Sequence, residues 1–132
     1  MTETYVALWN EPDADRRRRM IAELWVPDGS HFLQPPQELR ALAAQPGIAM
    51  TAILKAQGYE EIEARAASVY AHWVASEGLS FRGRDDADRL GDVVKFHWEA
   101  SAADGTLSAV GLSILLLAAD GRIGRDYTFI VA

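Results

Sequence analysis

Asp126 is the acidic side chain whose position best suits acid–base chemistry. The segment around it alternates like a half-buried strand, which places Asp126 and Thr128 on one face. An apolar environment raises the pKa of a carboxyl group by desolvation, as a general acid or base near neutrality requires. The alternative is structural, because a buried carboxylate without a partner is costly. An arginine at the sheet edge would then pair with it, and the candidates are Arg17, Arg122 and Arg125.

Tyr5 is the second candidate for chemistry, because its hydroxyl can donate a hydrogen bond to a ligand carbonyl. It lies in a predicted helix over residues 2–10, where Tyr5, Leu8 and Trp9 follow the spacing of one helix face. The alternative is a core tyrosine whose hydroxyl bonds to a neighbouring side chain. Catalysis, if present, is therefore expected from Asp126 and Tyr5.

Aromatic side chains are expected to form the inner wall of the fold, as core or as a ligand-binding surface. Phe96 and Trp98 alternate with polar residues, so they are expected inside and His97 outside. The wall residues predicted for ligand contact, beside Thr128, are Trp9, Trp25, Phe32, Gln34, Phe96, Trp98 and Ser113.

His31 alternates out of phase with Phe32 and Gln34 and is expected to face away from that wall. The sequence contains no cysteine, no His-x-x-x-His and no glycine-rich phosphate loop. We therefore expect no metal site and no cofactor.

The composition and charge limit the kinds of partner and the compartment that we expect for this chain. The chain has 132 residues and a formal net charge of −6, which argues against general nucleic-acid binding. Its most apolar run, 110–119, is about half the length that a membrane-spanning helix needs. The N-terminal residues lack a basic stretch followed by an apolar one, and the absence of cysteine fits a reducing compartment. We expect a single cytoplasmic domain over residues 1–132 that contacts neither membrane nor nucleic acid.

Helical periodicity comes first along the chain and strand alternation last. Helices are predicted for 2–10, 13–26, 37–44 and 58–78, and short strands for 30–34 and 50–56, which are expected to pair. Longer strands are predicted for 79–84, 92–100, 107–118 and 123–131, with Asp-Gly hairpin turns between the last three. This order indicates an α+β fold, with helices on one face of an antiparallel sheet.

Several local strings, in this order, resemble the nuclear transport factor 2-like superfamily, in its SnoaL-like and steroid-isomerase-like branch. They are YVALWNEPD at 5–13, LWVPDG at 24–29 and GLSILLLAADGRI at 111–123. The resemblance implies a cone-shaped curved sheet, covered by about three helices, around a pocket for a small apolar molecule. It also implies a homodimer through the outer sheet face, and functions too diverse for the fold to decide among them.

The resemblance carries Tyr5 onto the tyrosine of the steroid-isomerase oxyanion hole, but two acids are missing. The general base falls on Gln34 and the second oxyanion-hole acid on Ser113. A glutamine amide cannot accept a proton at neutral pH, so isomerase chemistry in that form is not expected. Three hypotheses remain, in this order: a small-molecule-binding domain without turnover, a SnoaL-like isomerase, cyclase, hydrolase or dehydratase using Asp126 and Tyr5, and a protein-interaction module.

Overall fold

The computed structural model describes residues 1–35 and 54–132 of the chain. The helix predicted for 37–44 lies outside the described residues, as does the first part of the strand predicted for 50–56. The three other predicted helices and all the later strands lie within them.

The helices are α1 (Thr2–Asn10), α2 (Ala14–Leu24) and α4 (Gly58–Val69), and α4 continues as a π-helix, η1 (Tyr70–Ser76). Asp13 caps α2, because its side chain accepts a hydrogen bond from the backbone N–H of Arg16 at 2.9 Å. α2 ends two residues before the predicted boundary, since Trp25 is already extended and begins a strand. Gly78 follows η1 with a φ of +70°, the left-handed conformation expected of a helix C-terminal glycine.

The sheet contains seven strands among the described residues. They are β1 (Trp25–Leu33), β2 (Leu54–Gln57), β3 (Ser80–Gly83), β4 (Asp88–Leu90), β5 (Val93–Ser101), β6 (Leu107–Leu117) and β7 (Ile123–Ile130). Their order is β2-β1-β7-β6-β5-β3, and β4 pairs with β5. β1 runs parallel to β7 and all other pairs are antiparallel, so the sheet is mixed.

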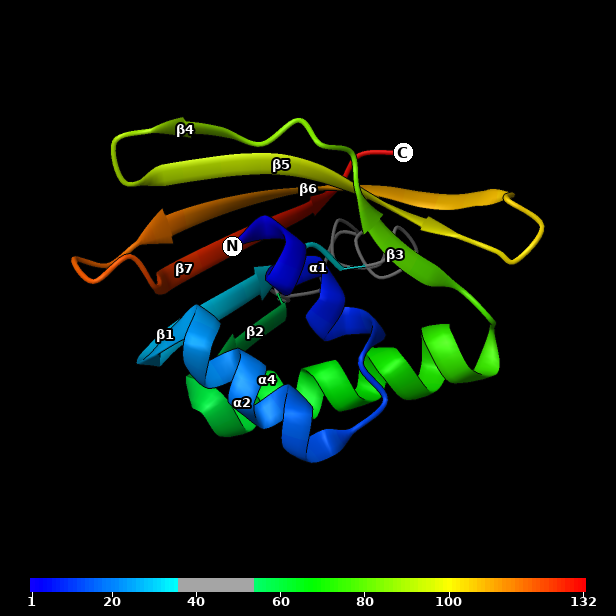
Figure 1. The fold of residues 1–132 in the computed structure, drawn as a ribbon, viewed down its shortest axis with the longest axis horizontal. Helices are drawn as coiled ribbons and strands as arrows, with labels where there is room; N and C mark the ends of the chain where they lie inside the picture. The colour runs from blue at the N-terminus through cyan, green and yellow to red at the C-terminus, as the bar shows by residue number, and fades with distance from the viewer. Residues whose placement is uncertain (36–53) are drawn as a thin grey trace, which may run out of the picture.

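The α+β class is confirmed, with the helices gathered on one face of the curved sheet (Figure 1). The predicted pairing of β1 with β2 is also observed, and it is antiparallel. The short strand β4 and the parallel β1–β7 pair were not predicted. Among the described residues, no helix is long and apolar enough to cross a membrane.

An irregularity in β1 changes which of its side chains face the helices. Trp25 is opposite Ile123 and Ser30 is opposite Arg125, so β1 has three more residues than β7 between these two points. As a result Gly29, Ser30 and His31 are buried in succession, which breaks the simple alternation.

The hydrophobic core lies between the sheet and the helices. Its completely buried side chains come from both layers: Leu8, Ile21, Trp25, Ile62, Leu115 and Ile123. This packing fixes α1 and α4 against the sheet, and these two helices carry Tyr5 and Arg65, two of the polar side chains of the site described next.

Candidate functional site

The candidate site is a hollow of about 430 Å³ between α1, α4–η1 and the sheet, named here the inner cavity. Apolar side chains make most of its wall, among them Trp9, Val69, Trp73, Leu79, Trp98 and Ile130. Its polar lining residues are Tyr5, His31, Gln34, Arg65, Ser108 and Thr128. The size falls within the range of small-molecule sites, which are apolar hollows with a few placed polar groups.

Trp98 reaches its place in the wall because it lies over a glycine. A Cβ on Gly111, its cross-strand partner on β6, would come within 2.0 Å of the indole carbon Cζ2. The indole Nε1 donates a hydrogen bond to the Ser113 hydroxyl at 3.1 Å. Gly111 therefore makes room for the indole, and Ser113 fixes its orientation.

A short hydrogen bond joins Tyr5 and Asp126 at the inner end of the cavity. The Tyr5 hydroxyl donates to Oδ2 of Asp126 at 2.5 Å, and the Thr128 hydroxyl donates to Oδ1 at 2.9 Å. Ser113 lies 2.9 Å from the Thr128 hydroxyl and 3.3 Å from the Tyr5 hydroxyl. The Asp126 carboxyl group is completely buried and has no solvent-accessible surface.

His31 and Arg65 form the second polar group of the cavity. Nη1 of Arg65 donates to Nδ1 of His31 and to the His31 carbonyl, each at 2.9 Å. An arginine only donates, so Nδ1 is the acceptor and the neutral ring carries its proton on Nε2. That nitrogen lies 3.6 Å from Oδ2 of Asp126.

Burial shifts both Asp126 and His31 towards their neutral forms. Desolvation raises the pKa of Asp126 from 3.8 to about 7, although hydrogen bonds from Tyr5 and Thr128 and the charge of Arg65 act in the opposite direction. Desolvation, followed by the nearby Arg65 charge, lowers the pKa of His31 from 6.5 to about 3. Their contact is therefore not an ion pair at neutral pH, because His31 is uncharged there.

Burial also raises the pKa of Tyr5 well above 10, with a further contribution from the charge of Asp126. Tyr5 therefore keeps its proton at neutral pH. The arrangement provides a buried carboxyl group, with a pKa raised to about 7, that accepts a hydrogen bond from a residue lining the cavity. Among residues 1–35 and 54–132, no three His, Asp or Glu side chains are grouped so as to hold a metal ion.

Several solved structures share this architecture. A provisionally assigned isomerase of the SnoaL-like family from Agrobacterium tumefaciens C58 matches with a TM-score of 0.77 at 23% identity, covering 99% of this chain and 94% of that one. An NTF2-like protein of unknown function from Exiguobacterium sp. 255-15 gives 0.62 at 16% identity, with 98% and 97% covered. A provisionally assigned polyketide cyclase from Sinorhizobium meliloti gives 0.55 at 16% identity, with 95% and 89% covered. The chain has an NTF2-like fold.

The resemblance inferred from the sequence is thus confirmed at the level of the fold. No protein-family model matches the chain, and a comparison with curated protein sequences finds no match. The NTF2-like fold hosts many activities, so the function must be argued from the residues of the cavity.

Within this NTF2-like fold, six of the predicted site residues lie together. Tyr5, Trp9, Gln34, Trp98 and Thr128 line the inner cavity, and Ser113 lies directly behind its wall in contact with Tyr5 and Trp98. Asp126 is not itself a lining residue: it lies behind Tyr5, His31 and Thr128. The arginines considered as its partners, Arg17, Arg122 and Arg125, do not pair with it.

The predicted ligand contact is wrong for three aromatic residues. Phe32 faces the opposite side of the sheet, where it stacks on Tyr127 with ring centroids 4.9 Å apart. Trp25 and Phe96 pack against the Tyr5 ring in the core and do not line the inner cavity. The error at Phe32 arises from the irregularity in β1, which also turns His31 inward, contrary to expectation.

Arg65 and His31 are the site residues that the sequence reasoning missed. Arg65 follows Ile62 by three positions and precedes Ala66, both of which are buried on α4, so helical spacing alone places it beside the apolar face. His31 gave no comparable signal, since its orientation depends on the extra residues in β1.

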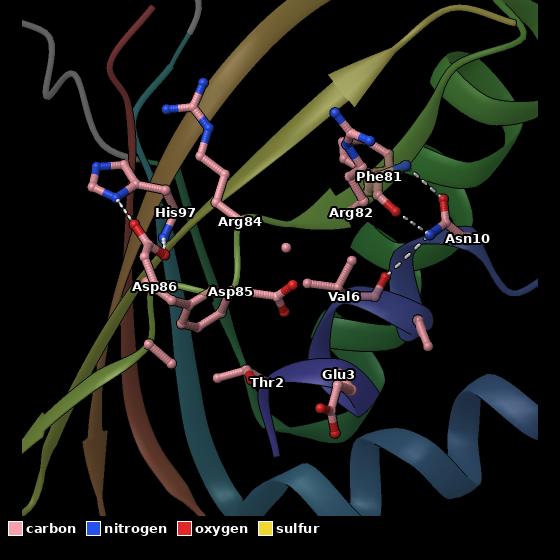
Figure 2. A pocket seen from close by; sticks show the side chains of 14 residues that line it. Thr2, Glu3, Val6, Asn10, Phe81, Arg82, Arg84, Asp85, Asp86 and His97 are labelled. Carbon is pink, nitrogen blue, oxygen red and sulfur yellow. Dashed lines mark hydrogen bonds and ion pairs between the residues drawn. The ribbon is translucent and has the colours of Figure 1, made fainter. Parts of the chain in front are cut away.

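A second hollow, named here the outer depression, lies on the other side of α1 (Figure 2). Asn10 joins α1 to β3 there, donating to the Phe81 carbonyl at 2.7 Å and accepting from its N–H at 2.8 Å. Asp86 lies 2.6 Å from Nδ1 of His97, and Arg84 pairs with Glu99. The outer depression thus has several charged side chains in its lining, and His97 lies outside the inner cavity as expected.

Proposed function

We propose that this chain binds a small molecule with an apolar body in the inner cavity. The observation that carries the proposal is the combination of an apolar wall with a few polar groups, Tyr5, Gln34, Arg65 and Thr128 among them, in a hollow of about 430 Å³. The similar solved structures include proteins provisionally assigned as an isomerase and a polyketide cyclase, which supports a small-molecule role without identifying the ligand.

Two matched alanines provide the test. Ala109 lines the inner cavity and Ala87 lines the outer depression. Titration with the apolar dye Nile red should show saturable binding to the wild-type protein, followed by dye fluorescence. Ala109→Leu should weaken this binding at least several-fold by filling the cavity, whereas Ala87→Leu should leave it unchanged. Equal effects of the two substitutions would contradict binding in the inner cavity.

A second candidate function is acid–base turnover of the bound molecule. The specific observation in its favour is the 2.5 Å hydrogen bond between the hydroxyl of Tyr5, which lines the cavity, and Asp126, whose pKa of about 7 suits proton transfer at neutral pH. Asp126 does not face the cavity, so protons pass through Tyr5. When Asp126 is ionised, the Tyr5 oxygen accepts a proton from the carbon next to the ligand carbonyl while the Tyr5 proton moves to Oδ2 of Asp126, which leaves the ligand enolate and a protonated Asp126.

Hydrogen–deuterium exchange at the carbon next to a ketone tests this second candidate. NMR would follow the exchange in a ligand ketone that the cavity binds. Asp126→Asn should slow protein-dependent exchange by about 100-fold or more while dye binding is retained. Asp86→Asn, at the outer depression, is the matched control. Absence of exchange in the wild-type protein would leave the binding function alone.

A further inference from the structure

Arg65 is the one ionic side chain among the described residues that line the inner cavity. It projects from α4, and the other lining residues are apolar or neutral at pH 7. No described carboxylate comes within the 4.0 Å of its guanidinium that defines the ion pairs of the structure. Within the described part of the chain, no carboxylate therefore neutralises Arg65 at contact distance, and Asp126 and Glu61 act on its charge only from further away.

The hydrogen bonds of Arg65 leave one edge of the guanidinium for a ligand. Every hydrogen bond that Arg65 forms with the described residues is donated by Nη1. The acceptors are neutral: the ring and carbonyl of His31 and, at 3.4 Å, the Leu54 carbonyl. Nε and Nη2 make no hydrogen bond with a described residue. This edge presents two parallel N–H groups, the geometry that matches the two oxygens of a carboxylate.

Two other polar groups of the cavity, Gln34 and His31, use an acceptor atom within the protein. Oε1 of Gln34 accepts from the Ile130 N–H at 2.9 Å, so its amide nitrogen remains as a donor. Nδ1 of His31 accepts from Arg65, and the Thr128 hydroxyl donates to Asp126. The Gln34 amide thus adds a donor beside Arg65, whereas the Tyr5 and Thr128 hydroxyls, which both donate to Asp126, offer a ligand only their oxygens.

Desolvation strengthens the preference for an anion. Burial lowers the pKa of Arg65, which shows that its cationic form is partly deprived of water. A partly desolvated cation gains from an anion that approaches with good hydrogen-bond geometry.

From these four observations we propose that the ligand of the inner cavity carries a carboxylate, held by the Nε–Nη2 edge of Arg65, on an apolar body that contacts the aromatic and aliphatic wall. This inference rests on the proposed binding function and adds the class of ligand: apolar carboxylic acids in their ionised form.

The test compares three ligands with the same apolar chain and different head groups. Decanoate, decanamide and decylamine would be titrated into the full chain at pH 7 and followed by isothermal titration calorimetry. Decanoate should bind about tenfold more tightly than decanamide, as expected for a charge-assisted hydrogen-bonded pair, and decylamine most weakly. Equal binding of decanoate and decanamide, or tighter binding of decylamine, would overturn the carboxylate inference while leaving the binding function intact. No binding by any of the three would overturn both.

Variants of Arg65 test whether this side chain causes the preference for decanoate over decanamide. Arg65→Gln should abolish the difference between decanoate and decanamide, and Arg65→Lys should retain only part of it, since lysine keeps the charge but loses the planar edge. Arg84→Gln, at the outer depression, should leave the difference unchanged. A full preference for decanoate in Arg65→Gln would overturn the assignment. The wild-type comparison of ligands decides the inference even if an Arg65 variant fails to fold.

Discussion

The molecule contains two Asp–His pairs, one on each side of α1, and their electrostatics are opposite. At the outer depression, Asp86 and His97 are about 40% exposed and 2.6 Å apart, and hydrogen bonds from His97 lower the pKa of Asp86 (Figure 2). In the inner cavity, Asp126 and His31 are buried and 3.6 Å apart, and desolvation moves both towards neutrality. The same residue types form an exposed hydrogen-bonded pair with a lowered aspartate pKa in one place and a buried pair with a raised aspartate pKa in the other. Burial, not residue type, makes the difference.

The two members of the buried pair also affect the pH dependence of stability in opposite directions, so that their effects partly cancel. Asp126 folds with a raised pKa, so it lowers stability as the pH rises from 3.8 to about 7. His31 folds with a lowered pKa, so its contribution increases as the pH rises from about 3 to 6.5. The two slopes oppose each other across most of this range, and single variants should expose them.

The largest effect is expected from His31→Gln. The neutral folded form of His31 adds stability that is complete above pH 6.5 and lost as the pH falls towards 3, about 5 kcal/mol for the full shift. The variant lacks this term, so its stability should decline with rising pH between 4 and 7 through Asp126 alone. Urea unfolding at a series of pH values measures it. A variant profile parallel to that of the wild type would contradict the neutral assignment of His31.

Asp126→Asn should produce the opposite slope. Ionisation of Asp126 in the fold costs about 4 kcal/mol once the pH exceeds 7, and asparagine removes this cost. The free energy of unfolding of the variant should therefore rise between pH 3 and 6.5 and exceed that of the wild type most clearly at pH 8. The same urea series serves here. If the variant instead loses stability relative to wild type, and loses more at pH 8 than at pH 4, Asp126 is ionised at low cost in the fold.

Alanine substitutions at two glycines, one at each hollow, test how tightly the inner cavity and the outer depression are packed. Gly111→Ala should cost about 2 kcal/mol, because the new Cβ would overlap the Trp98 ring and displace it from the Ser113 hydroxyl. Gly83→Ala should cost little, since its Cβ would meet only a Val6 methyl at 3.9 Å. Thermal unfolding gives both values, and Trp98 displacement should also weaken Nile red binding in the first variant alone.

The smallest effect is expected from Asp86→Asn. The lowered pKa of Asp86 contributes stability above its ordinary pKa that is lost as the pH falls, but solvent screens this exposed pair to less than about 1 kcal/mol. Added salt should reduce the difference between variant and wild type further. A loss of several kcal/mol, measured by urea unfolding at pH 7, would remove the contrast between the two pairs.

The sequence predicted the fold where hydrophobic spacing follows regular periods. α4 and β5 were predictable because Ile62 and Ala66 mark one helix face and Phe96 and Trp98 one strand face. For β1 a strand over 30–34 was predicted, but not its start at Trp25 or its side-chain orientations, because three extra residues shift its register and exchange the orientations expected for His31 and Phe32. The homodimer expected from the resemblance stays a prediction.

The candidate site was predictable only in part, for a related reason. Asp126 was identified from residue type and strand alternation, and Tyr5 from helical spacing and the family resemblance, and the two lie in contact. The contact of Asp126 with His31 requires the parallel β1–β7 pairing, which no local pattern indicates. The role of Arg65 depends on which helix covers the cavity, a tertiary property that follows from packing between distant segments.

The contrast between the two sides of α1 depends most on the raised pKa of Asp126 inside the fold. An NMR titration of the aspartate side-chain carboxyl carbons measures this directly, with Asp126→Asn used to assign the signal and Asp86 as the internal comparison. We expect Asp126 to titrate near pH 7 and Asp86 below 3.8 in the same sample. If Asp126 titrated below about pH 4, alongside Asp86, the buried carboxyl would be an ordinary carboxylate. The contrast between the two sides of α1 would then be wrong.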